Sequence, residues 1–497
     1  MRVYSMYDAV IIGAGIGGMT CGTVLAKAGK KVLIAERHKR PGGYVTSYSC
    51  DGFIFDVPHI IGGLRKDNYL WKVLREIGID QEFIELEPYQ KIIYPGREIR
   101  VYTDIEKNKN ELKAFFPQDS GDIDRFYNTL SKLNEELQGI PEELGIFDML
   151  SFPLKFPTVF KYVNSVLEKM LDDHMKNPEL KAVLSSAWGY IGSPPSKVSA
   201  LYYAAMLMCF HDGGAWYPKG GYQKLADAFA KAFETCTGEL QLNTEVTKII
   251  IEKGKATGVR LKDGREIRSA LVVSNADTRR TFLELVGEEH LKKKFADCIK
   301  NSELSGSGFV VHLGVKMDLE KTDLNYGSIF LKIDEKENAF LPDGKTSISS
   351  IGISVPSLHD RSLAPGGCHT MDIIVTPAPY DFADKWLTDD GKRTDAYRKL
   401  KGEVADKLIR TAETLIPGLS GNIVAKDIST PLSYERYTLS SNGCWYDLAQ
   451  IPSQSGIHRF AHSKIINNLL FAGSKSLGGG INAAVRGGYI TAKKILK

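Results

Sequence analysis

The chain has 497 residues, and its 64 basic and 60 acidic side chains leave a formal net charge of +4, a balance that argues against nucleic acid as a partner. At this length, with 43% hydrophobic and 25% charged residues, we expect a globular protein of two or three closely joined lobes rather than a single core. Seven scattered cysteines without a C-x-x-C pair fit a reducing cytoplasm, and the lack of any run of 18 apolar residues predicts no membrane-spanning helix.

The beginning of the chain predicts a strand, a glycine turn, a helix and a second strand. These are Tyr7–Ile12, residues 13–18, about Gly17–Ala28 and Lys31–Glu36. In the turn, Gly13 permits the tight bend, Gly15 lets the backbone approach a pyrophosphate, and Gly18 lets the helix pack on the sheet. The N-terminus of the helix points its amides at the phosphates. The predicted phosphate site comprises Gly13, Ala14, Gly15, Gly17 and Gly18.

An acidic residue, Glu36, closes the second strand at the distance from the turn that a ribose-binding acid requires. Its carboxylate can accept hydrogen bonds from both ribose hydroxyls, and it would repel a 2′-phosphate. Arg37 follows directly and is predicted to balance the charge of the cofactor. The turn, the helix and the acid together predict a site for a dinucleotide.

A second glycine pair, Gly42 and Gly43, follows the acid where a nicotinamide-binding domain would continue into another helix and strand. Its unhindered backbone offers a further approach to phosphate or ribityl oxygens. The alternating stretch Gly52–Gly63 then forms a strand that runs into a bend at Pro58 and His59. This order of elements favours a flavin dinucleotide over a nicotinamide one.

The middle of the chain alternates between helical and strand patterns. Apolar spacing predicts a helix over Tyr69–Ile77 that Gly78 ends. Further on, the patterns predict a helix, two short strands, a hairpin with an Asp-Gly turn and two strands of a second, mixed sheet. They cover Tyr222–Phe233, Leu240–Val246, Lys248–Glu252, Gly258–Ile267, Gly308–Gly314 and Met371–Val375.

The C-terminal stretch predicts a buried strand from Asn468, a glycine-rich turn and a final helix through about Leu496. The N-terminus of that helix offers partial positive charge to a reduced, anionic flavin ring. Its predicted cofactor residues are Gly473, Ser474, Gly480, Ile481 and Asn482. Because segments more than 400 residues apart have complementary roles, we expect one extended cofactor, FAD.

Taken together, the chain resembles the carotenoid and retinoid branch of the FAD amine-oxidase-like superfamily, which includes phytoene desaturases, carotene isomerases and retinol saturases. The likeness spans nearly the whole chain. A histidine before paired glycines in Phe55–Gly63 resembles the retinol saturases more than the bacterial desaturases. The motifs that carry the resemblance are the turn with Glu36, Pro41-Gly42-Gly43, Phe55–His59, Tyr217–Gly221, Val272–Asp277, Phe471-Ala472-Gly473 and Gly478-Gly479-Gly480.

This resemblance implies an α/β fold with a Rossmann-like FAD-binding domain of the glutathione-reductase type, interrupted in sequence, a mixed-sheet substrate domain and a helical cap. It implies that Val246 pairs its backbone with the adenine edge and that Asn275 and Ala276 close over the cofactor. The expected FAD-binding parts are residues 1–65, 220–300 and 466–497; the cap and substrate parts are residues 66–219 and 301–465.

Two dense apolar segments, Ile146–Pro157 and Ala200–Phe210, stand out for the substrate. They predict either an elongated tunnel for an isoprenoid lipid, with a mouth that rests on a membrane surface, or two core helices. The resemblance favours the tunnel. The oligomeric state is not predicted.

Few protein groups are needed for the chemistry, because the flavin gives or takes the hydride. His59 is predicted either to position the flavin or a proton, or to be a structural histidine; Tyr217 is predicted either to bind substrate or to be structural. His458 and His462 have helical zinc spacing but no third ligand in the sequence, so we predict no metal site.

Three functions remain open at this point. The first is a flavoenzyme that desaturates, saturates or isomerises carbon–carbon double bonds of a polyene or isoprenoid lipid. The second is a flavoenzyme of the same fold that oxidises an amine or another small substrate. The third is a non-enzymatic binder like the prenyl-protein escort proteins, which the intact turn, Glu36 and the C-terminal glycines disfavour.

Overall fold

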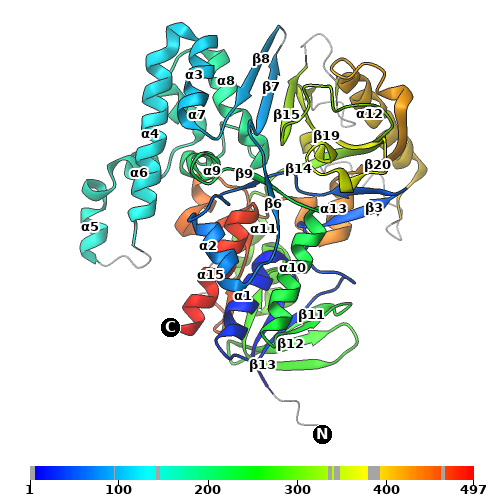
Figure 1. Ribbon diagram of the computed structural model, residues 1–497. Coiled ribbons are helices and arrows are strands. Elements are labelled where there is room, and N and C mark those ends of the chain that lie inside the picture. The colour runs from blue at the N-terminus through cyan, green and yellow to red at the C-terminus, as the bar shows by residue number, and fades with distance from the viewer. Residues whose placement is uncertain are drawn as a thin grey trace.

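The computed structural model describes residues 6–94, 96–141, 146–333, 339–340, 347–378, 392–459 and 465–497. Figure 1 shows one sheet near the N-terminus, a second sheet at the upper right and a group of helices at the upper left. This arrangement confirms the predicted α/β class with a mixed-sheet part and a helical part.

The first sheet takes its parallel strands from three distant stretches of the chain. β1 (Tyr7–Ile12) lies between β2 (Val32–Ala35) and β13 (Glu266–Ser274), β10 (Glu239–Gln241) extends the sheet beyond β2, and β21 (Leu469–Phe471) pairs with β13. The stretches predicted for the FAD-binding domain therefore share one sheet. Their boundaries stay a prediction.

An antiparallel extension of this sheet consists of β11 (Val246–Glu252) and β12 (Lys255–Leu261), with β12 also paired to β13. The predicted Asp-Gly turn joins β12 to β13, with Gly264 at φ +87°. The predicted strand Leu240–Val246 is wrong: β10 ends at Gln241, and β11 begins at Val246. Asn243 has φ +51°, a left-handed conformation that no strand accommodates, so the chain turns between them.

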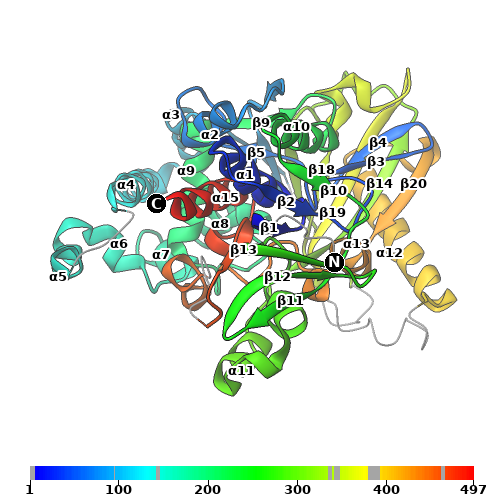
Figure 2. The same ribbon diagram turned by 90° about the horizontal axis from the view of Figure 1, so that it is seen from below.

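Helix α1 (Ile16–Lys27) is buried on every side, from Ile16 through Ala26. The C-terminal helix α15 (Ile481–Leu496) lies beside it in both views (Figures 1 and 2). Glycines allow the two helices to approach closely: a Cβ on Gly488 would lie 2.1 Å from the Gly17 carbonyl oxygen. The first and last helices of the chain are thus in direct contact.

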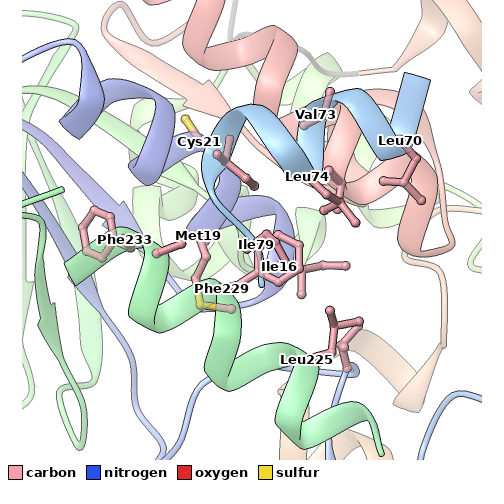
Figure 3. Packing of buried hydrophobic residues seen from close by; sticks show 14 of the residues in the cluster. Ile16, Met19, Cys21, Leu70, Val73, Leu74, Ile79, Leu225, Phe229 and Phe233 are labelled. Carbon is pink, nitrogen blue, oxygen red and sulfur yellow. The ribbon is translucent and has the colours of Figure 1, made fainter. Parts of the chain in front are cut away.

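Two further helices cover α1. α10 (Tyr222–Thr235) buries Phe229 and Phe233, and α2 (Tyr69–Ile77) buries Leu70, Val73, Leu74 and Ile77 at helical spacing. Figure 3 shows Phe229 and Phe233 of α10 and Leu70, Val73 and Leu74 of α2 in one cluster with Ile16 and Met19. The predicted helix over Tyr69–Ile77 and its end at Gly78, with φ +81°, are confirmed.

The second sheet is mixed, as predicted. Among its described strands, only β15 and β7 pair in parallel, and every residue of β14 is buried. β14 and β19 contain the predicted strands Gly308–Gly314 and Met371–Val375, and their register sets His312 opposite Asp372. In order, the strands are β20 (Ile423–Ser429), β14 (Ser307–Val315), β19 (His369–Ala378), β18 (Ser350–Ser354), β15 (Ser328–Lys332), β7 (Gln90–Tyr94) and β8 (Arg97–Val101).

Short ribbons connect the lobes, and α12 (Asp395–Glu413) packs on the second sheet. One ribbon pairs β9 (Ala215–Pro218) with β5 (Ile61–Gly62) and β6 (Phe83–Glu85); the other pairs β3 (Ser47–Cys50) with β4 (Phe53–Asp56). All seven cysteines are free thiols. The fold therefore needs no disulfide to hold its lobes together.

The helical lobe lies beside the second sheet, with α5 and α6 farthest from it (Figure 1). In the part of the chain that the structure describes, no helix is both long and apolar enough to cross a bilayer. The lobe consists of α3 (Ile105–Phe115), α4 (Ser120–Gly139), α5 (Ile146–Lys155), α6 (Pro157–Tyr162), α7 (Leu167–Asp172), α8 (Pro178–Ser185) and α9 (Ala200–Gly213).

Candidate active site

A cavity of about 1330 Å³ lies where the two sheets and the helical lobe meet. Pockets for one small molecule usually measure roughly 300–1,000 Å³, so this cavity has room for a cofactor and a second ligand. Most of the predicted site residues line it. They are Gly13, Gly15, Gly17, Glu36, Arg37, Gly42, Gly43, Pro58, His59, Val246, Asn275, Ala276, Ser474, Gly480, Ile481 and Asn482.

The glycine turn joins β1 to α1 at one end of this cavity. Gly15 has an ordinary φ of −69°, so its need for glycine is one of space and not of backbone conformation. No side chain caps the N-terminus of α1, which leaves its first amides for an anion. Gly18 does not line the cavity: a Cβ there would lie 2.5 Å from the Gly13 carbonyl oxygen. Its role is the helix packing that the sequence analysis gave it.

The side chain of Asn275 occupies the space that these glycines leave. A Cβ on Gly15 would lie 2.6 Å from Asn275 Nδ2, and one on Gly473 would lie 2.4 Å from Asn275 Oδ1. Gly473 itself does not line the cavity; it lies against Gly17, where a Cβ on Gly17 would be 2.3 Å from its Cα. The turn therefore accommodates an asparagine from the next strand as well as a ligand, which the sequence motif does not indicate.

Glu36 ends β2 with a buried carboxylate that faces the cavity. Its Oε2 accepts a hydrogen bond from the Ala14 amide at 2.8 Å, and its Oε1 accepts one from the His38 amide at 2.8 Å. These two bonds fix the carboxylate and leave its remaining lone pairs for ribose hydroxyls. Ala14, which we predicted to bind the cofactor, does not line the cavity; its amide instead orients Glu36.

The second glycine pair closes over the first. The Gly42 amide donates to the Ala14 carbonyl oxygen at 2.8 Å, and Gly42 has φ +124°. A Cβ on Gly42 would lie 2.2 Å from the Val45 carbonyl oxygen, so the loop needs glycine for both conformation and space. The loop lines the cavity with unhindered backbone, as predicted.

The N-terminus of α15 also lines the cavity. Gly480 precedes the helix at φ +89° without a side-chain cap, so the first amides of the helix remain for a ligand. Asn482 donates from Nδ2 to the Gly62 carbonyl oxygen at 3.3 Å and lies 3.2 Å from the Cys209 sulfur. This contact fixes α15 against the strand that follows His59.

Two buried carboxylates, Asp277 and Asp447, also line the cavity, and sequence reasoning missed them. Burial and then the negative charge of Asp447 raise the pKa of Asp277. Asp277 accepts hydrogen bonds from the amide and hydroxyl of Ser441 at 3.0 and 2.8 Å. Asp277 directly follows the predicted pair Asn275-Ala276, but Asp447 could not be placed beside it from sequence.

Pro58 and His59 line the cavity next to the segment of β5. The Nε2 of His59 lies 3.1 Å from Oδ2 of Asp372, a residue of β19 in the second sheet. The prediction that His59 follows a strand ending near the cofactor site agrees with this position. The sequence did not indicate that His59 contacts Asp372, because the two residues are 313 positions apart.

Tyr217 takes the structural alternative. It is 1% exposed, does not line the cavity, and its hydroxyl donates to the buried carboxylate of Asp56. Asp56 also accepts from the Tyr222 amide at 3.0 Å, at the start of α10. Burial raises the pKa of Asp56 to about 6, even though its donors lower it. A contact between Tyr217 and substrate finds no support in this placement.

The other part of the cavity lining, here called the apolar end, is formed by side chains from the end of α4, α9, the short helix η2 (Ser186–Tyr190), the second sheet and the chain after α13 (Pro431–Thr438). The predicted apolar segment Ala200–Phe210 contributes several of them, whereas no described side chain of Ile146–Pro157 lines the cavity. The apolar end comprises Leu137, Ile140, Trp188, Tyr190, Ile191, Tyr202, Ala205, Met206, Met208, Phe210, Phe330, Ile374, Trp445 and Tyr446.

A metal has no evident place in this site. Among the described residues, no group of three or more histidine, cysteine or acidic side chains could hold one. His462, half of the pair with zinc spacing, lies outside the described residues.

A flavin dinucleotide fits the residues present. The glycine turn leaves backbone space for a pyrophosphate, the Glu36 carboxylate is fixed toward the cavity, and two uncapped helix N-termini face it. Each of these features binds a different part of an extended, anionic cofactor.

Comparison with known proteins gives relatives along the whole chain. Prolycopene isomerase of Daucus carota is 30% identical over 98% of this chain and 80% of its own. A neurosporene-forming phytoene desaturase of Rhodobacter capsulatus is 28% identical over 99% of this chain and 94% of its own. All-trans-retinol 13,14-reductase of Danio rerio is 26% identical over 93% of this chain and 80% of its own.

Solved structures share the fold. An oxidoreductase of Methanosarcina mazei superposes with a TM-score of 0.64 at 18% identity, covering 98% of this chain and 99% of its own. The family model of the flavin-containing amine oxidoreductases matches residues 16–496, nearly the entire chain. The chain therefore belongs to the flavin-containing amine oxidoreductase family, and it is a flavin-dependent oxidoreductase.

Proposed function

We propose that the protein uses FAD to desaturate, saturate or isomerise carbon–carbon double bonds of an apolar isoprenoid polyene. The observation that carries this proposal is the continuity of one cavity from the glycine turn to the apolar end. The similar proteins are named for prolycopene, phytoene and all-trans-retinol, which are polyenes of this class.

FAD, rather than a flavin mononucleotide, is supported by the adenosine side of the cavity. Glu36 and the backbone of Val246 line a part of the cavity that a mononucleotide would leave empty. The turn and the N-terminus of α1 would hold the pyrophosphate, and the N-terminus of α15 would lie at the ring system. When bound, FAD supplies the acceptor or donor of a hydride.

The chain's own contribution is orientation and the exclusion of water. Trp188, Tyr190 and Phe330 come from two elements on one side of the apolar end, and Trp445 and Tyr446 come from the chain after α13. Flat aromatic faces on these positions suit a planar conjugated chain, which gains from their contact without any hydrogen bond. None of these side chains carries a charge that would bind an ammonium group.

Two other functions are less well supported. An amine substrate is consistent with the family and with the aromatic side chains, but the carboxylates of Asp277 and Asp447 already accept hydrogen bonds from Ser441 and Thr278. A non-enzymatic binder would have no use for the space above the glycine turn or for the fixed carboxylate of Glu36.

Anaerobic reoxidation tests the proposed function. The purified protein is loaded with FAD. One sample is reduced with dithionite and mixed, without oxygen, with phytoene, prolycopene or all-trans-retinol. A second sample, in which FAD is oxidised, is mixed with putrescine. We expect a polyene, and not the amine, to change the flavin spectrum or the polyene itself. Reduction by the amine would instead support an amine oxidase, and failure to retain any flavin would support the binder.

A membrane supplies a substrate of this kind, and we propose that the helical lobe rests on it. Leu150 and Leu154 of α5 and Phe160 of α6 are 74%, 86% and 54% exposed. Leu137 of α4 and Ile140, which follows it, line the cavity and precede these residues in the chain. Exposed apolar side chains of this kind are a feature that a bilayer recognises.

Vesicle binding tests this contact. We expect the triple variant Leu150→Ser, Leu154→Ser, Phe160→Ser to lose at least about tenfold in affinity for phosphatidylcholine–phosphatidylglycerol vesicles. Val424→Ser is the control, because Val424 is an apolar residue that is exposed to nearly the same extent as Phe160, at 52%, on β20 at the opposite side of the molecule (Figure 1). Equal losses in both variants would contradict the proposed contact.

A further inference from the structure

Three polar side chains run from the cavity wall into the second sheet. His59 lines the cavity, and its Nε2 lies 3.1 Å from Oδ2 of Asp372. The other carboxylate oxygen, Oδ1, lies 2.6 Å from Nδ1 of His312, whose Nε2 lies 3.2 Å from the Ser429 hydroxyl. We call His59, Asp372 and His312 the His–Asp–His chain.

The His–Asp–His chain is largely buried, and this affects the ionisation of its carboxylate. The side chains of Asp372 and His312 are 1% and 2% exposed, and that of His59 is 13% exposed. Burial alone would raise the pKa of Asp372, but His312 and then His59 lower it to about 2. The carboxylate is therefore ionised at neutral pH, and both ring nitrogens that face it carry hydrogen.

The protonation of these nitrogens fixes the tautomer of His59. Its Nε2 donates to Asp372, so Nδ1 is the nitrogen left to gain or lose a proton. Among the described residues, His59 Nδ1 has no hydrogen-bond partner.

The other titratable groups around Asp372 do not compete for this role. Tyr48 and Tyr434 are neutral, because burial raises the pKa of each phenol far above its usual value. Asp427 lies behind Tyr48, which donates to it at 3.0 Å. Asp56 interacts with Asp372 at longer range, and its donors are Ser47, Tyr217 and the Tyr222 amide.

We propose that His59 exchanges a proton with the substrate through Nδ1, and that Asp372 and His312 are positioning residues that hold its ring and its tautomer. This proposal rests on the proposed function and deepens it. His59 would be the catalytic residue, because it alone of the three lines the cavity.

The proton balances the reaction at a double bond. Saturation adds a hydride to one carbon and a proton to the other; the reduced flavin is the hydride donor. As the new C–H bond forms, the Nδ1–H bond of His59 breaks and its electron pair stays on the nitrogen. Desaturation runs the same transfers in reverse, with the oxidised flavin as hydride acceptor and neutral His59 as proton acceptor.

Variants in which an amide nitrogen replaces one ring nitrogen distinguish proton exchange by His59 from a purely structural contact between the lobes. In His59→Gln, the amide nitrogen takes the place of Nε2 and can still donate to Asp372, but no proton can be exchanged. We expect an unchanged melting temperature and flavin content, with a fall in polyene turnover of about 10²–10⁴-fold. If His59 only joined the lobes, His59→Gln would retain turnover within about threefold.

The positioning residues are tested by His312→Asn and Asp372→Asn. In His312→Asn, the amide nitrogen replaces Nδ1, so Asp372 keeps a hydrogen-bond donor. This variant therefore provides the test if Asp372→Asn fails to fold. We expect both variants to shift the pH dependence of kcat/KM and to leave KM unchanged. Asp427→Asn is the matched control, since it neutralises a carboxylate of the same sheet without touching His59. Asp56→Asn identifies any pH dependence that arises from Asp56.

Nitrogen NMR of histidine-labelled, FAD-loaded protein provides a readout independent of turnover. The His59 resonances are assigned by their loss in His59→Gln, and we expect them to show the Nε2–H tautomer when the ring is neutral. In Asp372→Asn or His312→Asn, we expect the proton affinity of His59 to fall about tenfold. A His59 titration identical in wild type and both variants would overturn the proposal.

The two readouts also distinguish this proposal from the proposed function. If no polyene reacts with the wild-type protein, the substrate class is wrong while the His59 titration still decides whether the positioning exists. If polyenes react and His59→Gln is as active as wild type, the proposed function stands and the proton role of His59 falls.

Discussion

Backbone atoms form most of the glycine-lined end of the cavity, whereas side chains form its apolar end. At the glycine-lined end, Gly15, Gly17 and Gly42 expose main-chain atoms on the cavity wall, and Glu36 adds one fixed carboxylate. At the apolar end, aromatic and aliphatic groups from α9, η2 and the second sheet meet without a shared local motif. Chemistry common to many enzymes is thus encoded in short segments, and the choice of substrate is spread over the fold.

The largest expected effect is at the glycine turn. Gly15→Val should yield a colourless protein, because a Cβ there would already lie 2.6 Å from Asn275 Nδ2. The visible spectrum and the flavin released on denaturation measure this. Gly402→Ala is the control, since nothing lies within 4 Å of a Cβ on that helix. A yellow, fully loaded Gly15→Val protein would contradict the importance of backbone space at this end.

Glu36→Ala tests the single side chain that the glycine-lined end depends on. The variant loses charge-assisted hydrogen bonds worth about 1.5–3 kcal/mol, so FAD should bind roughly tenfold to a hundredfold more weakly. Fluorescence titration of the apoprotein measures the dissociation constant. Glu239→Ala, on the neighbouring strand β10 and bonded to Tyr7, should leave it unchanged.

Ala205→Phe tests the apolar end by adding a large side chain to it. Ala205 lines the cavity from an exposed position on α9, so a larger side chain intrudes without disturbing the core. We expect full flavin content and at least about a tenfold loss in kcat/KM for polyenes, measured by product formation. Ala205→Ser, which adds little volume, should behave as wild type. Loss of flavin in Ala205→Phe would mean that the two ends are not separable.

The smallest effect concerns stability where the two lobes join. Asp56 is buried, and its pKa is raised to about 6 from an ordinary 3.8. Its protonated form is therefore favoured by folding: the contribution is fully present below pH 4 and is lost as the pH rises through 6. The melting temperature of wild type relative to Asp56→Asn should fall across this interval, by the equivalent of about 1–3 kcal/mol. A pH-independent difference would show that Asp56 is ionised throughout.

The comparison of the two ends also explains what could be predicted from sequence. The position of Glu36 was predictable because the amides that bond its carboxylate, those of Ala14 and His38, lie in or next to one strand–helix–strand unit. Gly15 belongs to the same unit, but its contact with Asn275 was not predictable. The hydrogen bond from the Ala14 amide to Glu36 was not predicted, because the glycine motif does not indicate it.

Partners across the sheets were not predictable in the same way. The pairing of His312 with Asp372 depends on the register of β14 against β19, and no local pattern sets that register. The role of Tyr217 depends on Asp56, which lies 161 residues earlier in the chain. Long-range contacts of this kind become visible only in the folded molecule.

The pairing of β13 with β21 and the contact of α1 with α15 have a consequence for biosynthesis. While the ribosome makes residues 30–465, α1 lacks one of the helices that cover it, and β13 lacks one of its neighbouring strands. Domains normally fold from the N-terminus as they emerge, but this one must wait until residues 466–497 have emerged. We expect nascent chains halted before residue 466 to remain sensitive to protease across α1, and to depend on chaperones until release.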